Sequence, residues 1–324
     1  MGTVVLGTGS CLPGKVLTNV DLESIVETND EWIRSRTGIE SRRIAGKGEY
    51  TYKIAADAAK KALAAAGVSA SEIGLVVLGT ISSHMLMPSS ACFVQNEIGA
   101  VNAFSYDLNA ACSGFLYGLD LADKYIKDDH SMKVLVIGAE TLSGRLNWKD
   151  RNTCILFADG AGAAVCGYSE SDRGIIGSQL LSDGSLWKLL HMHAPKSYNP
   201  DLLVEDNDGT FIQMEGKEVF KHAVRAMEDS VRVLLKKENI DLDSIDVFIP
   251  HQANIRILNN LIDRLKVPRS KVFINVSKYG NTSAASIPIA LDEANSSGMI
   301  SKGDTVLFCS FGGGFTWGAT LIKW

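Results

Sequence analysis

Residues 68–77, VSASEIGLVV, recur in outline 172 positions later as residues 240–249, IDLDSIDVFI. Apolar residues stand at matching places in the two stretches, and each stretch follows an amphipathic helical pattern. The first of these patterns, residues 51–66, ends before Gly67, a residue type typical of helix C-termini. Short β-branched strands alternate with helices along the chain, which indicates an α/β protein. The repeat therefore predicts two similarly wound α/β halves.

Further pieces of the repeat follow in the same order along the chain. The strand-like residues 3–6 match residues 175–178, and residues 108–112 match residues 274–277. We therefore expect the two halves to be joined near residue 172 and to share a cleft, since α/β proteins bind ligands at the ends of their strands. Chance similarity between two ordinary strand–helix–strand segments is the alternative explanation.

Composition excludes several functional classes. The net charge of −5 argues against general nucleic-acid binding, because counterion release requires a basic surface. The longest apolar runs, such as residues 134–139, are too short to cross a bilayer, and no basic-then-apolar leader precedes the first strand, so we expect no membrane association. The six cysteines lack C-x-x-C spacing, which fits a reduced, cytoplasmic compartment better than a disulfide framework.

The first segment that could carry chemistry is residues 107–120, DLNAACSGFLYGLD, which predict a strand, a tight turn of small residues and a helix. This pattern places Cys112 at a helix N-terminus, where unpaired N–H groups and the helix dipole stabilise a thiolate. We therefore expect a nucleophilic Cys112 whose pKa lies below the ordinary value of about 8.5. A buried structural cysteine is the alternative, and the other cysteines keep that interpretation.

Two polar segments of the second half supply further candidates. Residues 246–254, DVFIPHQAN, place His251 after a strand closed by proline, where a neutral imidazole can donate to a thioester carbonyl or move a proton. Residues 278–288, KYGNTSAASIP, place Asn281 in a turn before a helix, where its amide can hold a carbonyl oxygen. Taken singly, each residue also fits a structural role, because histidines after strands and asparagines in turns are common.

Glycines and histidines elsewhere give weaker signals. Residues 310–318, SFGGGFTWG, allow positive φ and close backbone approach, so an N–H there can point at an oxyanion; a bulged core strand is the alternative. His191 and His193 form an H-x-H pair without a third ligand, so we expect no metal site. The glycine motifs for dinucleotides and phosphates are incomplete, and Gly-x-Ser-x-Gly does not occur.

Four segments occur in a specific order: AACSGF around Cys112, PHQAN around His251, GNTSAAS around Asn281, and FGGGFTWG near the C-terminus. As an ordered set they closely resemble the β-ketoacyl-acyl-carrier-protein synthase III family, over almost the whole chain. The resemblance implies a thiolate-forming cysteine in an N-terminal thiolase-like half, residues 1–172. It also implies a C-terminal thiolase-like half, residues 173–324, that carries the histidine and the asparagine.

The reaction follows from this resemblance. Cys112 would take an acyl group from acyl-coenzyme A, and His251 and Asn281 would bind the malonyl thioester and stabilise the enolate left by decarboxylation. The carbanion would attack the acyl group on Cys112 and give a 3-oxoacyl thioester, the step that initiates fatty acid synthesis. The N–H groups of Cys112 and Gly313 would hold the oxyanion. Covalent catalysis with fixed donors requires neither a metal nor a cofactor.

The resemblance also implies the binding residues. Those expected to contact coenzyme A are Trp32, Arg36, Arg151, Gly216, Phe220 and Asn254. Lys221 and Arg256 would meet an acidic acyl carrier protein bearing the malonyl group, with a solvated charged face as the alternative. A homodimer is implied, in which the segment near Met87 reaches the partner's acyl pocket. Met87, where an aromatic residue often stands, and the long segment 188–209 leave the acyl primer open.

Three other functions are compatible with parts of this pattern. A ketosynthase that primes a polyketide, or an acyltransferase of secondary metabolism, would share the fold and the nucleophile. A biosynthetic thiolase would need a second cysteine as base, and Cys309 does not stand at the matching position. A non-catalytic thioester-binding protein would keep the fold, but it has no need of a thiolate at a helix tip.

Overall fold

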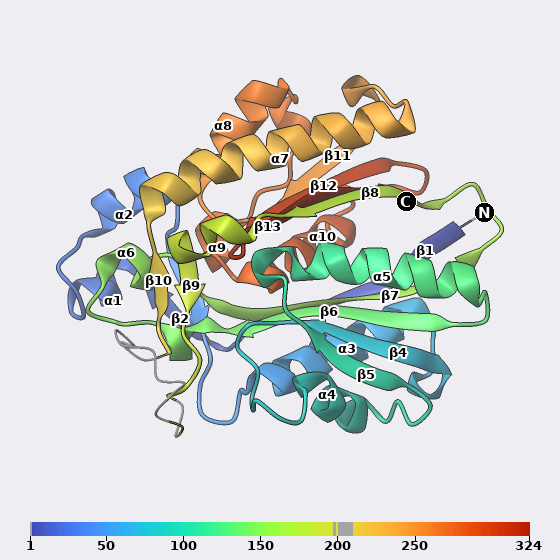
Figure 1. Ribbon diagram of the computed structural model, residues 1–324, viewed down its shortest axis with the longest axis horizontal. Helices are drawn as coiled ribbons and strands as arrows, with labels where there is room; N and C mark the ends of the chain where they lie inside the picture. The colour runs from blue at the N-terminus through green and yellow to red at the C-terminus, as the bar shows by residue number, and fades with distance from the viewer. Residues whose placement is uncertain (1, 197–198, 200–209) are drawn as a thin grey trace.

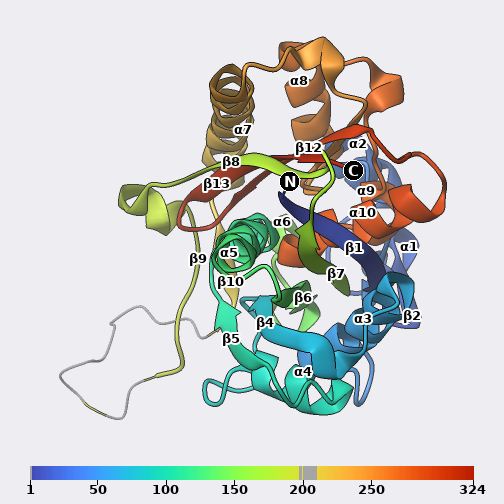
Figure 2. The ribbon, with the colours of Figure 1, turned by 90° about the vertical axis from the view of Figure 1, so that its right-hand side faces the viewer.

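The computed structural model describes residues 2–196, 199 and 210–324. Two mixed β-sheets are stacked in it, with helices between them and on both outer faces (Figure 1, Figure 2). The first sheet has the strand order β1-β7-β6-β4-β5 and the second has the order β11-β12-β13-β8. Helices α5 and α10 fill the space between the sheets, α3 and α4 cover the first sheet, and α7 and α8 cover the second (Figure 2).

The bounds of the strands are β1 Gly2–Cys11, β2 Lys15–Thr18, β3 Ser41–Ile44, β4 Ile73–Gly79, β5 Phe104–Leu108, β6 Lys133–Thr141, β7 Asp159–Ser169, β8 Gly174–Ser182, β9 Leu190–Met192, β10 Ile212–Met214, β11 Val247–Pro250, β12 Thr305–Gly312 and β13 Thr316–Lys323. Those of the helices are α1 Asn19–Glu23, α2 Asp30–Thr37, α3 Thr51–Ala66, α4 Ser90–Ile98, α5 Gly114–Asp128, α6 Arg151–Cys154, α7 Gly216–Glu238, α8 Ile255–Leu265, α9 Val276–Tyr279 and α10 Ser286–Ser296.

Alternating side chains join these layers. In β6, Val134 and Val136 pack into the central layer, whereas Leu135 and Ile137 face the outer helices α3 and α4. In β12 of the second sheet, alternate side chains likewise pack into the central layer and against the outer helices. Successive side chains of a strand point to opposite faces, so a strand that is apolar throughout must be covered on both sides. The continuous apolar strands of this sequence therefore require helices on both faces of each sheet.

The helices bury one face each, as their periodicity predicts. Helix α3 begins and ends where the sequence indicates, and Gly67 closes it with a φ of 63° in the left-handed region. Its buried positions are mostly alanines, which let it lie close against β1, where a Cβ added at Gly7 or Gly9 would collide with the helix backbone. None of the helices in the described part of the chain combines the length and apolarity needed to cross a lipid bilayer.

The two sheets confirm the two similarly wound halves. The order β4-β6-β7-β1 of the first sheet recurs as β11-β12-β13-β8 in the second. In both, the first pair of strands is parallel and the other two pairs are antiparallel. The counterpart of β5 is a parallel bridge between Phe248 and Val272, and residues 274–277 then enter the short helix α9, as residues 108–112 enter the turn Ala111–Ser113. The boundary at residue 172 falls between β7 and β8, and the division into domains 1–172 and 173–324 remains a proposal.

Candidate active site

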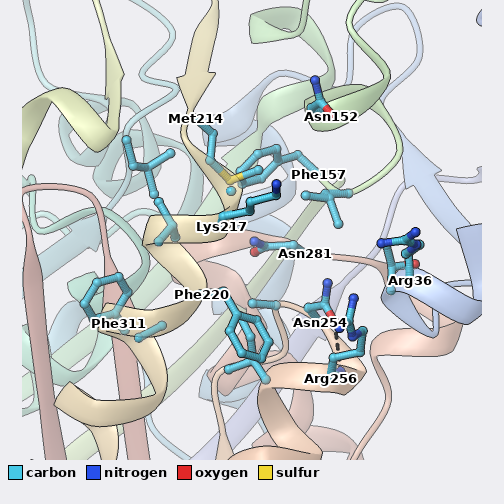
Figure 3. Close-up of a pocket in the computed structure, with 18 of the residues that line it drawn as sticks. Arg36, Asn152, Phe157, Met214, Lys217, Phe220, Asn254, Arg256, Asn281 and Phe311 are labelled. Atoms are coloured by element: carbon cyan, nitrogen blue, oxygen red, sulfur yellow. Dashed lines mark hydrogen bonds between the residues drawn. The ribbon is translucent and has the colours of Figure 1, made fainter.

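One cavity of about 730 Å³ is lined by Cys112, His251 and Asn281 together. The three residues come from a turn before α5, the loop after β11 and the turn before α10. Figure 3 shows the lining, with Asn281 in the middle of the residues drawn and the basic side chains Arg36 and Arg256 toward one side. The structure thus brings together the three candidates that the sequence places far apart.

Cys112 lies on a tight turn between a strand and a helix, as predicted. Strand β5 ends at Leu108, the turn Ala111–Ser113 forms one 3₁₀ winding, and α5 begins directly after it. Ala111 has a φ of 45°, which is uncommon for a residue with a Cβ and occurs often at functional turns. The hydroxyl of Ser310 on β12 donates to the carbonyl oxygen of Cys112 at 2.8 Å. The nucleophile is therefore held by both halves of the fold.

The pKa of Cys112 differs from the expected one. Its side chain is almost fully buried, and this burial raises the pKa of the thiol to about 12. The buried carboxyl group of Glu140 raises the pKa further, and only the Ser283 side chain and a backbone hydrogen bond lower it. The expectation of a lowered pKa is wrong for this buried thiol, because its loss of hydration raises the pKa more than the helix N-terminus lowers it. The resting form is a thiol, so the attack requires removal of its proton.

His251 is buried and uncharged. Its backbone N–H donates to the carbonyl oxygen of Cys309 at 2.8 Å, which fixes the residue at the end of β11. Burial lowers the pKa of its imidazole to about 4, so the ring is neutral at pH 7. Nδ1 lies 2.5 Å from the Oγ of Ser286, and this Oγ also accepts the backbone N–H of Gln252. The Ser286 hydroxyl can thus donate a hydrogen bond to Nδ1, and the neutral ring then carries its own proton on Nε2, which is left to donate into the cavity.

Asn281 is oriented by its own turn. Its backbone pairs with residues 156 and 158, at 2.9 Å in both hydrogen bonds. Its Oδ1 accepts the backbone N–H of Ser283 at 2.9 Å, so the amide oxygen faces the turn and Nδ2 remains to donate into the cavity. His251 and Asn281 therefore offer two uncharged N–H donors on the wall that they share with Cys112.

The C-terminal glycines lie directly against the nucleophile. A Cβ built on Gly312 would lie 2.5 Å from the backbone nitrogen of Cys112 and 3.1 Å from its Cβ. A Cβ on Gly313 would lie 3.8 Å from the Cβ of Ala111. The absence of side chains here lets the end of β12 approach the turn that carries the sulfur. The backbone N–H groups of this segment and of Cys112 are therefore neighbours.

Gly312→Ala is expected to slow acylation of Cys112 by about 10²-fold, because the added methyl must push the nucleophile from its position and a misplacement of about 1 Å can have that effect. The rate of acyl transfer from short acyl-coenzyme A thioesters measures it. Gly144→Ala is the control, since nothing lies near a Cβ at that position. Wild-type acylation in the Gly312 variant would show that the contact does not position the sulfur.

The residues implied for coenzyme A, with one exception, line the same cavity as the candidate trio. Trp32, Arg36, Gly216, Phe220 and Asn254 all line it. Arg151 does not; it lines a neighbouring cavity and places its guanidinium 4.9 Å from the centre of the Trp32 ring. Arg36 approaches the same ring at 5.9 Å. An aromatic face flanked by two guanidinium groups suits a nucleotide with phosphates.

The remaining site predictions fall outside the centre of the cavity. Lys221 and Arg256 line the cavity, but both side chains are exposed to solvent, and Lys221 forms an ion pair with Glu218 at 2.7 Å. Met87 is 85% exposed on the loop between β4 and α4 and does not line the cavity of its own chain. Most of the long segment 188–209 lies outside the described residues. Within the described ranges, no group of histidine, cysteine and acidic side chains, His191 and His193 included, could hold a metal ion.

Sequence reasoning missed three buried polar residues next to the candidate trio: Glu140, Ser283 and Ser286. A signal existed for Glu140, the only carboxylate in the apolar stretch KVLVIGAET that forms β6. The two serines lie in the small-residue run after Asn281, where the sequence gives no hint of which hydroxyl faces a catalytic group.

Comparison with known proteins identifies relatives along the whole chain. The family 3-oxoacyl-[acyl-carrier-protein (ACP)] synthase III matches residues 106–184, and its C-terminal part matches residues 235–324. The chain is 59% identical over 324 residues to a beta-ketoacyl-[acyl-carrier-protein] synthase III of Desulfotalea psychrophila, with both chains covered completely. A crystal structure of the 3-oxoacyl-[acyl-carrier-protein] synthase III of Aquifex aeolicus, 48% identical, superposes with a TM-score of 0.93 over 100% of both chains. A priming β-ketosynthase of a polyketide pathway, 35% identical, reaches 0.92 over 99% of this chain and 96% of its own.

Proposed function

The chain belongs to the 3-oxoacyl-[acyl-carrier-protein] synthase III family, and from this premise we propose that Cys112, His251 and Asn281 carry its reaction. It is a condensing acyltransferase with the thiolase fold, and its reaction initiates fatty acid synthesis. The observation that carries the assignment is the cavity that all three side chains line, with one thiol and two oriented N–H donors. The roles below follow from that arrangement.

Cys112 is the nucleophile. Its thiol loses its proton and attacks the carbonyl carbon of an acyl-coenzyme A, and coenzyme A leaves as the acyl group remains on sulfur. The negative charge on the carbonyl oxygen is held by the N–H groups of Cys112 and Gly313. The proximity of the glycine segment to the Cys112 turn supports this oxyanion site. Each donor of this kind typically contributes about 2.7–4 kcal/mol in acyl transfer.

His251 and Asn281 act on the second substrate. Nε2 of the neutral imidazole and Nδ2 of the amide donate to the carbonyl oxygen of a malonyl thioester. When carbon dioxide leaves, the electrons of the broken bond pass toward this oxygen, and the two donors stabilise the enolate. Its carbon then attacks the acyl group on Cys112 and forms the 3-oxoacyl product. Neutral donors suit this step, because a charged imidazolium would lose its proton to the carbanion.

The substrates fit the outer cavity. Acyl-coenzyme A would place its adenine at Trp32 between Arg36 and Arg151, and its pantetheine arm would pass Phe220 and Asn254 toward Cys112. A malonyl-acyl carrier protein would dock at Lys221 and Arg256, whose positive charges suit an acidic partner. The other elements of this proposal are a homodimer, in which the exposed loop around Met87 reaches the partner's cavity, a cytoplasmic location, and a reaction without metal or cofactor.

The test is a condensation assay with purified protein, malonyl-acyl carrier protein and a panel of straight, branched and longer acyl-coenzyme A primers. Mass spectrometry should show a 3-oxoacyl group on the carrier with at least one primer, together with released carbon dioxide. Transfer of the acyl group to a different acceptor without decarboxylation would contradict the proposed condensation.

Trp32→Ala is expected to raise the KM for acyl-coenzyme A about tenfold with little change in kcat, because base–aromatic stacking contributes about 1–3 kcal/mol and the ring takes no part in the chemical steps. Steady-state kinetics at varied acyl-coenzyme A concentration measure the change. Trp187→Ala, which removes a half-exposed tryptophan outside the cavity lining, is the control. An unchanged KM in the Trp32 variant would place the nucleotide elsewhere.

A further inference from the structure

Glu140 is a buried carboxyl group that the reaction described above does not use. It stands near the end of β6 and has no exposed surface. Its oxygens accept hydrogen bonds from the backbone N–H of Ile81 and the hydroxyl of Thr80, each at 3.2 Å, and from the hydroxyl of Ser82 at 2.5 Å. Within the described ranges no lysine, arginine or histidine pairs with it. A carboxylate buried without a cation is unfavourable, so its position calls for an explanation.

The turn Ser283–Ala285 lies between Glu140 and Cys112. Gly138 and Glu140 point to the same face of β6, because alternate residues of a strand share a face. A Cβ on Gly138 would lie 2.1 Å from the carbonyl oxygen of Ala284, so this face packs directly on the turn. On the other side, a Cβ on Gly114 would lie 3.5 Å from the Cβ of Ala284. The turn thus packs against Gly138, which is two residues before Glu140 in the sequence, and against Gly114, which is two residues after Cys112.

Ser283 is the side chain placed between these two groups. It is 1% exposed, and its Oγ has no hydrogen-bond partner among the described residues, so it is free to turn toward either group. Its φ of 50° is unusual for serine, and its backbone N–H is bonded to Asn281. The hydroxyl is nevertheless near enough to lower the pKa of both the Cys112 thiol and the Glu140 carboxyl. A hydroxyl can accept one proton and donate another, so it can connect a thiol to a carboxylate.

Resting on the proposed role of Cys112 as the acylated nucleophile, we propose that Glu140 is a positioning residue that takes and holds the Cys112 proton through Ser283 while the acyl group is on sulfur. As sulfur bonds to the thioester carbon, the thiol proton passes to Ser283 Oγ and the Ser283 proton passes to Glu140. Coenzyme A leaves with the electrons of the broken C–S bond and takes a proton from water. When condensation expels Cys112 as a thiolate, the proton returns from Glu140 by the same path.

Electrostatics favour this transfer over simple loss of the proton to water. A thiolate above an ionised Glu140 would place two negative charges in one buried site, and this repulsion is one reason that the thiol pKa is high. Moving the proton to Glu140 keeps one negative charge in the site throughout. A neutral carboxyl group also avoids repelling the oxyanion that forms during condensation. Burial raises the pKa of Glu140 to about 7, so it binds a proton far more readily than an exposed glutamate does.

The pH dependence has a definite sign. Glu140 must be ionised to accept the proton, so acylation should fall as the pH drops through about 7. The titratable group that faces it from the turn before α5 is Cys112, which titrates far higher, and the turn Thr80–Ser82 carries none. His251, which shares the cavity, titrates near 4. An inflection near neutral pH that the Glu140→Gln substitution removes therefore reports Glu140.

The experiment measures acylation and malonyl decarboxylation separately in full-length protein. Intact-mass time courses with a short acyl-coenzyme A between pH 5.5 and 9 follow acylation, and carbon dioxide release from malonyl-acyl carrier protein follows decarboxylation. Glu140→Gln and Ser283→Ala should each slow acylation about 10²-fold at pH 7.5, the usual contribution of a proton acceptor, and Glu140→Gln should lose the inflection. Glu140→Asp should restore part of the rate. Decarboxylation should stay within about twofold of wild type, because its donors are unchanged.

Asp123→Asn, which alters a mostly buried carboxylate on α5, the helix that follows the nucleophile, is the control and should acylate normally. Acylation at the wild-type rate and pH profile in Glu140→Gln would overturn the proposal. Faster acylation would overturn it as well, by showing that the carboxylate only repels the thiolate, and equal loss of acylation and decarboxylation would show a purely structural role. A wild-type protein that forms no acyl adduct would instead refute the proposed function of Cys112.

Discussion

Cys112→Ser is expected to lower condensation by at least about 10³-fold while malonyl decarboxylation continues. The hydroxyl that replaces the thiol is a much weaker nucleophile in a site that already raises the pKa of the sulfur, so acylation fails. His251 and Asn281 keep their positions and hydrogen bonds, which involve Ser286 and the Asn281 turn rather than the thiol. Their stabilisation of the enolate should therefore survive.

Two assays on the same preparation measure this prediction: formation of 3-oxoacyl-carrier protein and release of carbon dioxide from malonyl-carrier protein. Cys92→Ser is the matched control, because Cys92 lies on α4 outside the cavity and should be replaceable without loss of either activity. Equal loss of both activities in Cys112→Ser would contradict separate roles for the nucleophile and the two donors.

His251→Ala and Asn281→Ala should show the opposite behaviour. Each variant should still accept the acyl group on Cys112 but should extend it about 10²–10³-fold more slowly, the usual effect of removing one donor to a developing oxyanion. The rate of extension in the double variant should fall by less than the product of the two single effects. Both donors act on one oxygen, and the effects of residues that act as a unit are not additive.

Acylation by intact mass and single-turnover extension with malonyl-carrier protein separate the two steps. His130→Ala and Asn102→Ala are the controls, because neither residue lines the cavity. His130 stacks on Tyr168, and the side-chain amide of Asn102 donates to the carbonyl oxygen of Ser71. A His251 or Asn281 variant that condenses at the wild-type rate would show that the residue has been assigned wrongly.

Much of the fold could be predicted from local pattern. The alanine face of residues 51–66 and Gly67 gave the bounds of α3, because helix periodicity and a glycine stop are local signals. The repeat between residues 68–77 and 240–249 anticipated two sheets of the same strand order. Residues 108–112 and 274–277, matched in the sequence, both enter a short helical turn, but the sequence did not show that a bridge at Val272 takes the place of strand β5.

The sequence predicted the site residues that lie in recognisable motifs. It did not predict the properties that depend on three-dimensional packing. Cys112, His251 and Asn281 stand in recognisable segments, and all three line one cavity in the structure. The pKa of Cys112 was predicted in the wrong direction, because a helix N-terminus is visible in a sequence but complete loss of water is not. Packing between segments far apart in the sequence, such as the turn Ser283–Ala285 against β6, leaves no mark in the sequence for the same reason.

The most direct test of the account is peptide mapping of the protein after it is mixed with an acyl-coenzyme A primer that it uses. We predict one acyl group, on Cys112, that disappears when malonyl-acyl carrier protein is added and is recovered in a 3-oxoacyl product. Addition of the carrier to His251→Ala should leave the same adduct in place. An adduct on another cysteine, or a product formed without any adduct on Cys112, would contradict the account.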